Sequence, residues 1–108
     1  MHAEGAYKCA RAAWNRMREQ GYGRIINITS ATGIFGEINV ANYATAKMGL
    51  HGFTQSLALE GAKRNVLTNS VAPIADTRLL GLFDKHRDWI HPKYIVPLVA
   101  YLCHEGCK

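Results

Sequence analysis

A serine, a tyrosine and a lysine stand where a hydroxyl, a phenol and an ammonium could converge. Tyr43 and Lys47 are four residues apart, so on a helix their side chains lie on one face, one turn apart. Ser30 follows residues 25–28, an apolar run that predicts a buried strand. A strand end that delivers a serine beside a helix that presents tyrosine and lysine is the outline of a proton-transfer site.

The phenol needs help to act as a base. A free tyrosine has a pKa near ~10, so only about 0.1% of it is ionised at pH 7. A cation about 4 Å away, at an effective dielectric constant of ~20, favours the phenolate by up to roughly 4 kcal/mol, or about three pKa units. Lys47 is placed to supply that cation. For an isolated Tyr-x-x-x-Lys, the alternative is two unrelated residues of a helix surface, and the flanking sequence weighs against it.

Two short runs predict parallel strands of an α/β sheet. They span residues 24–29 and 66–71, and they are short enough to be buried strands. Ligands of open α/β sheets bind outside the carboxyl ends of the strands. The first strand therefore delivers Ser30 to the binding edge, and the second delivers residues 73–77.

Helices are expected before, between and after these strands. The first is amphipathic, because its apolar residues recur at three- and four-residue steps. It is expected to end at Gly21. The last begins at Pro92, which the first turn of a helix tolerates. Its buried face is expected to contain Ile95, Leu98, Val99 and Leu102.

The middle helix, from about residue 41 to 63, carries Tyr43 and Lys47. Beside its large apolar residues runs a stripe of small ones, which includes two mid-helix glycines. Each such glycine costs about 1 kcal/mol against alanine, so another backbone is expected to approach this stripe. The approaching backbone is either a second subunit or the chain's own sheet. The stripe consists of Thr45, Gly49, Gly52 and Ser56.

The sequence around these residues resembles the short-chain dehydrogenase/reductase family over nearly the whole chain. The resemblance rests on the Tyr43 and Lys47 pair and on residues 28–36, 69–75 and 102–105. Within the family, the chain resembles the (3R)-hydroxyacyl-CoA dehydrogenase domains of peroxisomal multifunctional enzymes and bacterial relatives. The resemblance implies a partial Rossmann-like, doubly wound parallel sheet. It also implies hydride transfer between NAD or NADP and a hydroxy or keto substrate, with 3-hydroxyacyl-CoA as one candidate.

The resemblance assigns catalytic roles to four residues. Tyr43 would be the acid/base, and Lys47 would lower its pKa and hold the nicotinamide ribose. Ser30 would hydrogen-bond the substrate oxygen. His2 stands where most members carry an asparagine that supports a proton relay, and imidazole can both donate and accept hydrogen bonds. The alternative for His2 is a terminal residue with no role.

Cofactor contacts are implied after the second strand as well. Pro73 and Ile74 would touch the nicotinamide half, although most members have glycine where Ile74 stands. Thr77 is the candidate hydroxyl for the carboxamide, and residues 78–92 would cover the substrate. No glycine-rich phosphate loop follows a strand anywhere in the sequence, so the adenine half of NAD or NADP has no site in it.

The length bears on completeness, because family members are typically much longer than 108 residues. We expect residues 1–108 to form a single incomplete domain, the catalytic half of the family fold, from a longer protein or a truncated gene. The alternative is a noncatalytic remnant that acts as a helix-pairing or oligomerisation module. The resemblance also implies a homo-oligomer formed through the two long helices.

Composition limits the partners and the compartment. The net charge is +5, but the basic residues are scattered, so no nucleic-acid partner is expected. No apolar run approaches the length that spans a membrane. Three cysteines, an odd number, favour reduced thiols in the cytoplasm, with the peroxisome as the alternative. Cys103, His104 and Cys107 supply at most three neighbouring ligands, so no metal site is expected.

Overall fold

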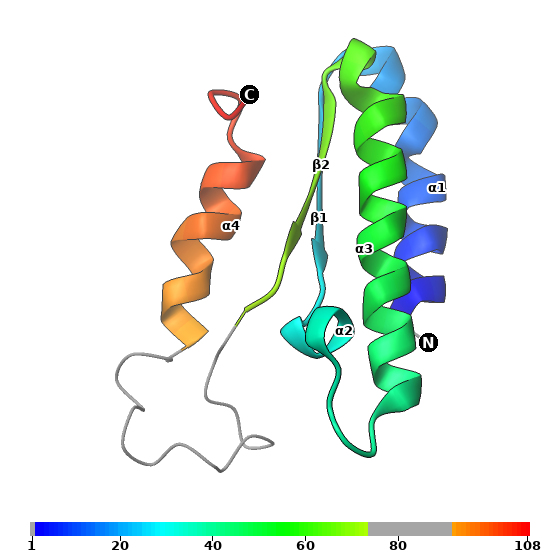
Figure 1. Ribbon diagram of the computed structural model, residues 1–108. Helices are drawn as coiled ribbons and strands as arrows, with labels where there is room; N and C mark the ends of the chain where they lie inside the picture. Colours follow the sequence, from blue (N-terminus) through cyan, green and yellow to red (C-terminus); the bar gives the residue numbers. More distant parts are fainter. Residues whose placement is uncertain (1, 74–91) are drawn as a thin grey trace.

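A computed structural model describes residues 2–73 and 92–108 (Figure 1). Its elements are α1 (His2–Gln20), β1 (Gly23–Ile28), α2 (Ala31–Phe35), α3 (Ala41–Gly61), η1 (Ala62–Arg64), β2 (Val66–Val71), η2 (Pro92–Tyr94) and α4 (Ile95–Cys103). The hydrophobic pattern predicts the two strands and the helices α1, α3 and α4 to within a turn. It does not predict the short helix α2.

The two strands are parallel neighbours. Gly23 lies opposite Val66, and Ile28 lies opposite Val71. Pairing continues beyond β1, because the N–H of Thr29 donates to the C=O of Val71 at 2.9 Å. Helices α1 and α3 lie on one side of the strands and α4 on the other, while α2 and the start of α3 lie at the carboxyl ends (Figure 1). The predicted α/β class and parallel order are confirmed.

The core lies between α3 and the sheet. Val66 is fully buried, and Leu50 and Leu57 of α3 are almost as inaccessible. Gly61 lets the end of α3 approach the start of β2. A Cβ atom there would lie 3.0 Å from the Cβ of Val66 and 3.1 Å from Cη2 of Trp14, closer than carbon atoms pack.

The stripe of small residues on α3 faces solvent among the described residues. A Cβ atom at Gly49 or Gly52 would meet no heavy atom within 4 Å, and Thr45 and Ser56 are exposed. The alternative in which the chain's own sheet approaches this stripe is therefore wrong for the described residues. Contact with a second subunit stays a prediction.

Helix α4 covers the sheet with a narrow stripe. Ile95, Val99 and Leu102 are half-buried, whereas Leu98, expected on the buried face, is 47% exposed. The three half-buried residues fall at steps of four and three, so they form one line along the helix. In the described part of the chain, this line of α4 lies against the two-stranded sheet, and Leu98 lies beside the line. No helix in the described segments is long and apolar enough to cross a bilayer.

Two glycines of α3 give opposite predictions for stability. Gly61→Ala is expected to lower the free energy of unfolding by about 1–3 kcal/mol, because the added methyl has no space. Gly52→Ala is expected to raise it by up to about 1 kcal/mol, because the methyl meets nothing and alanine favours the helix. Urea unfolding of both variants measures these changes. Shifts in the same direction would contradict the packing described for α3.

Candidate active site

Tyr43 and Lys47 meet the end of β1 at the carboxyl edge of the sheet. The Nζ of Lys47 donates to the C=O of Ile28 at 2.9 Å, two residues before Ser30. The same Nζ lies 5.6 Å from the centre of the Tyr43 ring. The structure therefore brings the predicted tyrosine and lysine together, next to the strand end that carries Ser30.

Lys47 is buried, which is unusual for a lysine. Its exposed fraction is 7%, and it lies on the face of α3 that packs on the sheet. An ammonium without water needs hydrogen-bond acceptors, and the carbonyl of Ile28 supplies one. An ammonium has three N–H donors, so this one bond to an acceptor among the described residues does not use them all.

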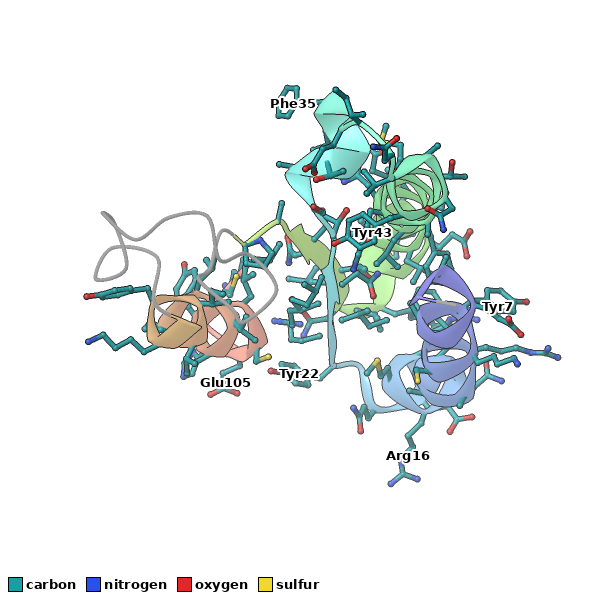
Figure 2. The ribbon with its side chains drawn as sticks, turned by 90° about the horizontal axis from the view of Figure 1, so that it is seen from below. Tyr7, Arg16, Tyr22, Phe35, Tyr43 and Glu105 are labelled. Atoms are coloured by element: carbon teal, nitrogen blue, oxygen red, sulfur yellow. The ribbon has the colours of Figure 1, made fainter. Side chains whose placement is uncertain are left out.

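Tyr43 lies in the first turn of α3 and is partly accessible, with 39% of its surface exposed. Its backbone N–H donates to the Oδ1 of Asn42 at 2.8 Å. Figure 2, seen from below, shows Tyr43 beside α3 near the ends of the strands. Tyr43 is thus partly accessible, and its ring lies near the ammonium of Lys47.

Ser30 caps helix α2. Its backbone is extended, with φ −150° and ψ 145°, and its Oγ accepts the N–H of Thr32 at 3.2 Å. A serine at the position before a helix is a strong N-cap signal, so the sequence contained evidence for α2. A hydroxyl that accepts one bond still has its own proton to donate. Capping therefore fixes the side chain and leaves its donor for a substrate oxygen.

The remaining predicted site residues are Pro73, Ile74, Thr77 and His2. Pro73 follows β2 at the same edge and is half-buried. Ile74 and Thr77 lie outside the described residues, as does most of the predicted substrate-covering segment. His2 is the first residue of α1, and its side chain also lies outside the described part.

Polar contacts between the sheet and α3 were not predicted from the sequence. The Nδ2 of Asn27 donates to the Oγ1 of Thr54 at 2.9 Å. The Nδ1 of His51 lies 3.1 Å from the Oγ of Ser70. The available signal was the period of two, since Asn27 and Thr29 alternate with apolar residues along the strand and therefore share one face.

Exposed apolar side chains lie on α2 and just after it. Phe35 and Ile38 are each 85% exposed, and Ile34 is 49% exposed. All three lie between Ser30 and Tyr43 in the chain, on α2 or just after it. Figure 2 shows Phe35 projecting away from the ribbon. This edge could therefore contact an apolar ligand.

Known proteins match the chain over most of its length. The family described as short chain dehydrogenase matches residues 2–86. The chain is 49% identical over 107 residues to peroxisomal multifunctional enzyme A of Dictyostelium discoideum. The matched region covers 97% of this chain and 24% of that protein. It is 42% identical over 110 residues to peroxisomal multifunctional enzyme type 2 of Mus musculus, and the match covers 100% of this chain and 15% of that protein. An acetoacetyl-CoA reductase of Allochromatium vinosum is 44% identical over 73 residues, and the match covers 68% of this chain and 30% of that protein.

Solved structures share the fold. Full-length peroxisomal multifunctional enzyme type 2 of Drosophila melanogaster superposes with a TM-score of 0.85 at 45% identity, over 99% of this chain and 19% of that one. A second structure is a protein of Beutenbergia cavernae assigned as an NAD(P)-dependent gluconate 5-dehydrogenase, with NADP bound at low occupancy. It superposes with a TM-score of 0.86 at 29% identity, over 97% of this chain and 48% of that one. The chain thus spans about a quarter or less of the length of these peroxisomal relatives.

The cap at Ser30 predicts a specific effect on stability. Ser30→Ala is expected to lower the free energy of unfolding by about 1 kcal/mol, because the N–H of Thr32 loses its acceptor. Ser30→Asn is expected to stay within a few tenths of a kcal/mol of the parent, because asparagine caps as well as serine. Urea unfolding measures both. Equal losses in the two variants would show that capping is not what Ser30 contributes.

Proposed function

The chain belongs to the short chain dehydrogenase family, and we propose that it supplies the catalytic residues of an NAD(P)-dependent oxidoreductase. The reaction would transfer a hydride between the nicotinamide and a hydroxy or keto substrate. The observation that carries this proposal is the pairing of Tyr43 with the buried ammonium of Lys47 beside the strand end that holds Ser30. Burial of a lysine is costly, and this one lies beside the phenol whose ionised form it would stabilise.

Three residues act on the proton and the substrate oxygen in this proposal. During oxidation, the phenolate of Tyr43 accepts the proton of the substrate hydroxyl, and during reduction the phenol returns it to the carbonyl oxygen. Lys47 stabilises the phenolate by its charge. Ser30 donates its O–H to the same substrate oxygen and holds it near the phenol. The bound nicotinamide supplies only the acceptor or donor of the hydride.

The residues at this edge fit the nicotinamide half of the cofactor. Lys47 uses one N–H on Ile28, which leaves donors for the ribose hydroxyls. Pro73, Ile74 and Thr77 are proposed to contact the nicotinamide ring and carboxamide. The choice between NAD and NADP depends on the adenosine half, for which this sequence has no glycine-rich loop. We therefore propose that residues 1–108 are a single incomplete domain.

The proposed substrate is a 3-hydroxyacyl-CoA or its keto form. The exposed Ile34, Phe35 and Ile38 could contact an acyl chain next to the reacting carbon. One relative is named an acetoacetyl-CoA reductase, and such a thioester has its keto group at the corresponding carbon. Other relatives are named peroxisomal, which favours the peroxisomal alternative over the cytoplasm for this chain.

A second candidate is a noncatalytic helix-pairing module. The observation in its favour is the exposed stripe of small residues on α3, which could pack closely against another helix. The two candidates are compatible in a homo-oligomer, where α1 and α3 would form the contact between subunits. They differ in the effect of removing the Tyr43 hydroxyl, which matters only to the enzyme.

Tyr43→Phe separates the two candidates. The variant is placed in a chimera in which this chain replaces the matching segment of the Dictyostelium enzyme, so that a complete oxidoreductase is assayed. NADH formation from a 3-hydroxyacyl-CoA is expected to fall by about 10²–10⁴-fold, because the proton acceptor is lost. Cofactor affinity is expected to stay unchanged.

The matched control is Tyr7→Phe, which removes a phenol hydroxyl from a half-exposed tyrosine on α1. It is expected to retain the parent rate. Parent turnover in Tyr43→Phe would rule out Tyr43 as the acid/base and would favour the noncatalytic candidate.

A further inference from the structure

The main chain of Lys47 is held by a residue of the strand end. The Oγ1 of Thr29 donates to the C=O of Lys47 at 2.8 Å, and Thr29 is only 5% exposed. In a helix that carbonyl also accepts the N–H four residues later, and a carbonyl has two lone pairs. Thr29 therefore adds a bond to α3 without displacing a helical one.

The ammonium of the same lysine is held by the residue before Thr29. The Nζ donates to the C=O of Ile28 at 2.9 Å. Thr29 is itself fixed to the sheet, because its N–H donates to the C=O of Val71. Two consecutive residues thus bind both ends of Lys47, and the next residue is Ser30.

Helix α2 closes on Lys47 from another direction. A Cβ atom at Gly33 would lie 2.8 Å from the N of Met48 and 3.0 Å from the Cβ of Lys47. Any side chain at Gly33 would therefore push α2 and α3 apart at Lys47. The space that glycine leaves is needed for this contact, because contacts so short are repulsive.

We propose that Thr29 and Gly33 are positioning residues for Lys47. The hydroxyl of Thr29 fixes the main chain of Lys47 to the sheet, and the absent side chain of Gly33 lets α2 pack against it. Together they set the place of the ammonium relative to Tyr43 and Ser30. The catalytic meaning of this arrangement rests on the proposed function, whereas the geometry is tested independently of turnover.

Thr54 provides a matched control. It is also buried, at 4% exposed, and lies on the same face of α3 two turns after Lys47. Its hydroxyl donates to the C=O of Leu50 at 2.8 Å and accepts from Asn27. Thr54→Val therefore removes a buried hydroxyl that bonds α3 to β1, as Thr29→Val does, but away from Lys47.

The geometric test is hydrogen exchange of the Lys47 ammonium in the full chain, followed by NMR with ¹⁵N-labelled lysine. A buried ammonium bound to a carbonyl is expected to exchange slowly with water. Thr29→Val and Gly33→Ala are expected to speed this exchange about tenfold, because each loosens the main chain that holds Lys47. Thr29→Ser keeps the hydroxyl and is expected to match the parent, as is Thr54→Val.

Exchange in Thr29→Val and Gly33→Ala at the parent rate would overturn the proposal, and so would equal acceleration in Thr54→Val. A parent chain without a slowly exchanging Lys47 ammonium would also overturn it. If Thr29→Val does not fold, Gly33→Ala decides the outcome against the Thr54→Val control.

The kinetic arm uses the chimera and compares kcat with KM. Thr29→Val is expected to lower kcat about tenfold and to shift the pH–rate profile, with Thr29→Ser restoring both. An unchanged profile in Thr29→Val with parent kcat would overturn the positioning role in catalysis. Failure of the proposed function is recognised separately, because Tyr43→Phe would then be fully active while the exchange rates still decide the geometry.

Discussion

The buried ammonium of Lys47 is the constraint on which this structure depends most. Removing an ammonium from water costs several kcal/mol unless hydrogen bonds compensate it, and the carbonyl of Ile28 is its acceptor. That bond exists only in one register of α3 on the sheet. A shift of one residue along the helix would rotate the side chain by about 100° away from the strand.

Hydrogen bonds along the interface between the sheet and α3 select the same register. Asn27 bonds to Thr54, Thr29 to the carbonyl of Lys47, and Ser70 to His51. Each contributes a net stabilisation of only about 1 kcal/mol, but a buried group left unpaired costs about 1–3 kcal/mol. The bonds therefore penalise wrong alignments, while the free energy of packing comes mainly from apolar side chains such as Leu50, Leu57 and Val66.

Different faces of α3 serve different purposes. The buried residues of α3 recur at steps of three and four, and they are Lys47, Leu50, Thr54, Leu57 and Gly61. The small residues of the exposed stripe recur at the same steps along another side of the helix, with Gly49 and Gly52 open to solvent. One helix can thus hold the site on its inner face and keep a second face available for a partner.

The sequence by itself determined the two strands, the long helices and the Tyr43–Lys47 spacing, because hydrophobic periodicity and helical spacing are local properties. It did not reveal the polar partners of Lys47. The bond from Thr29 and the contact at Gly33 join residues that only the packing of α3 on β1 and α2 brings together. Likewise, Leu98 fits the apolar pattern of α4, but it lies beside the line of residues that packs on the sheet and is exposed. The hydrophobic pattern along the chain predicts which residues could face the interior. Tertiary packing decides which of those residues make contacts there, because the contacting groups lie far apart in the sequence.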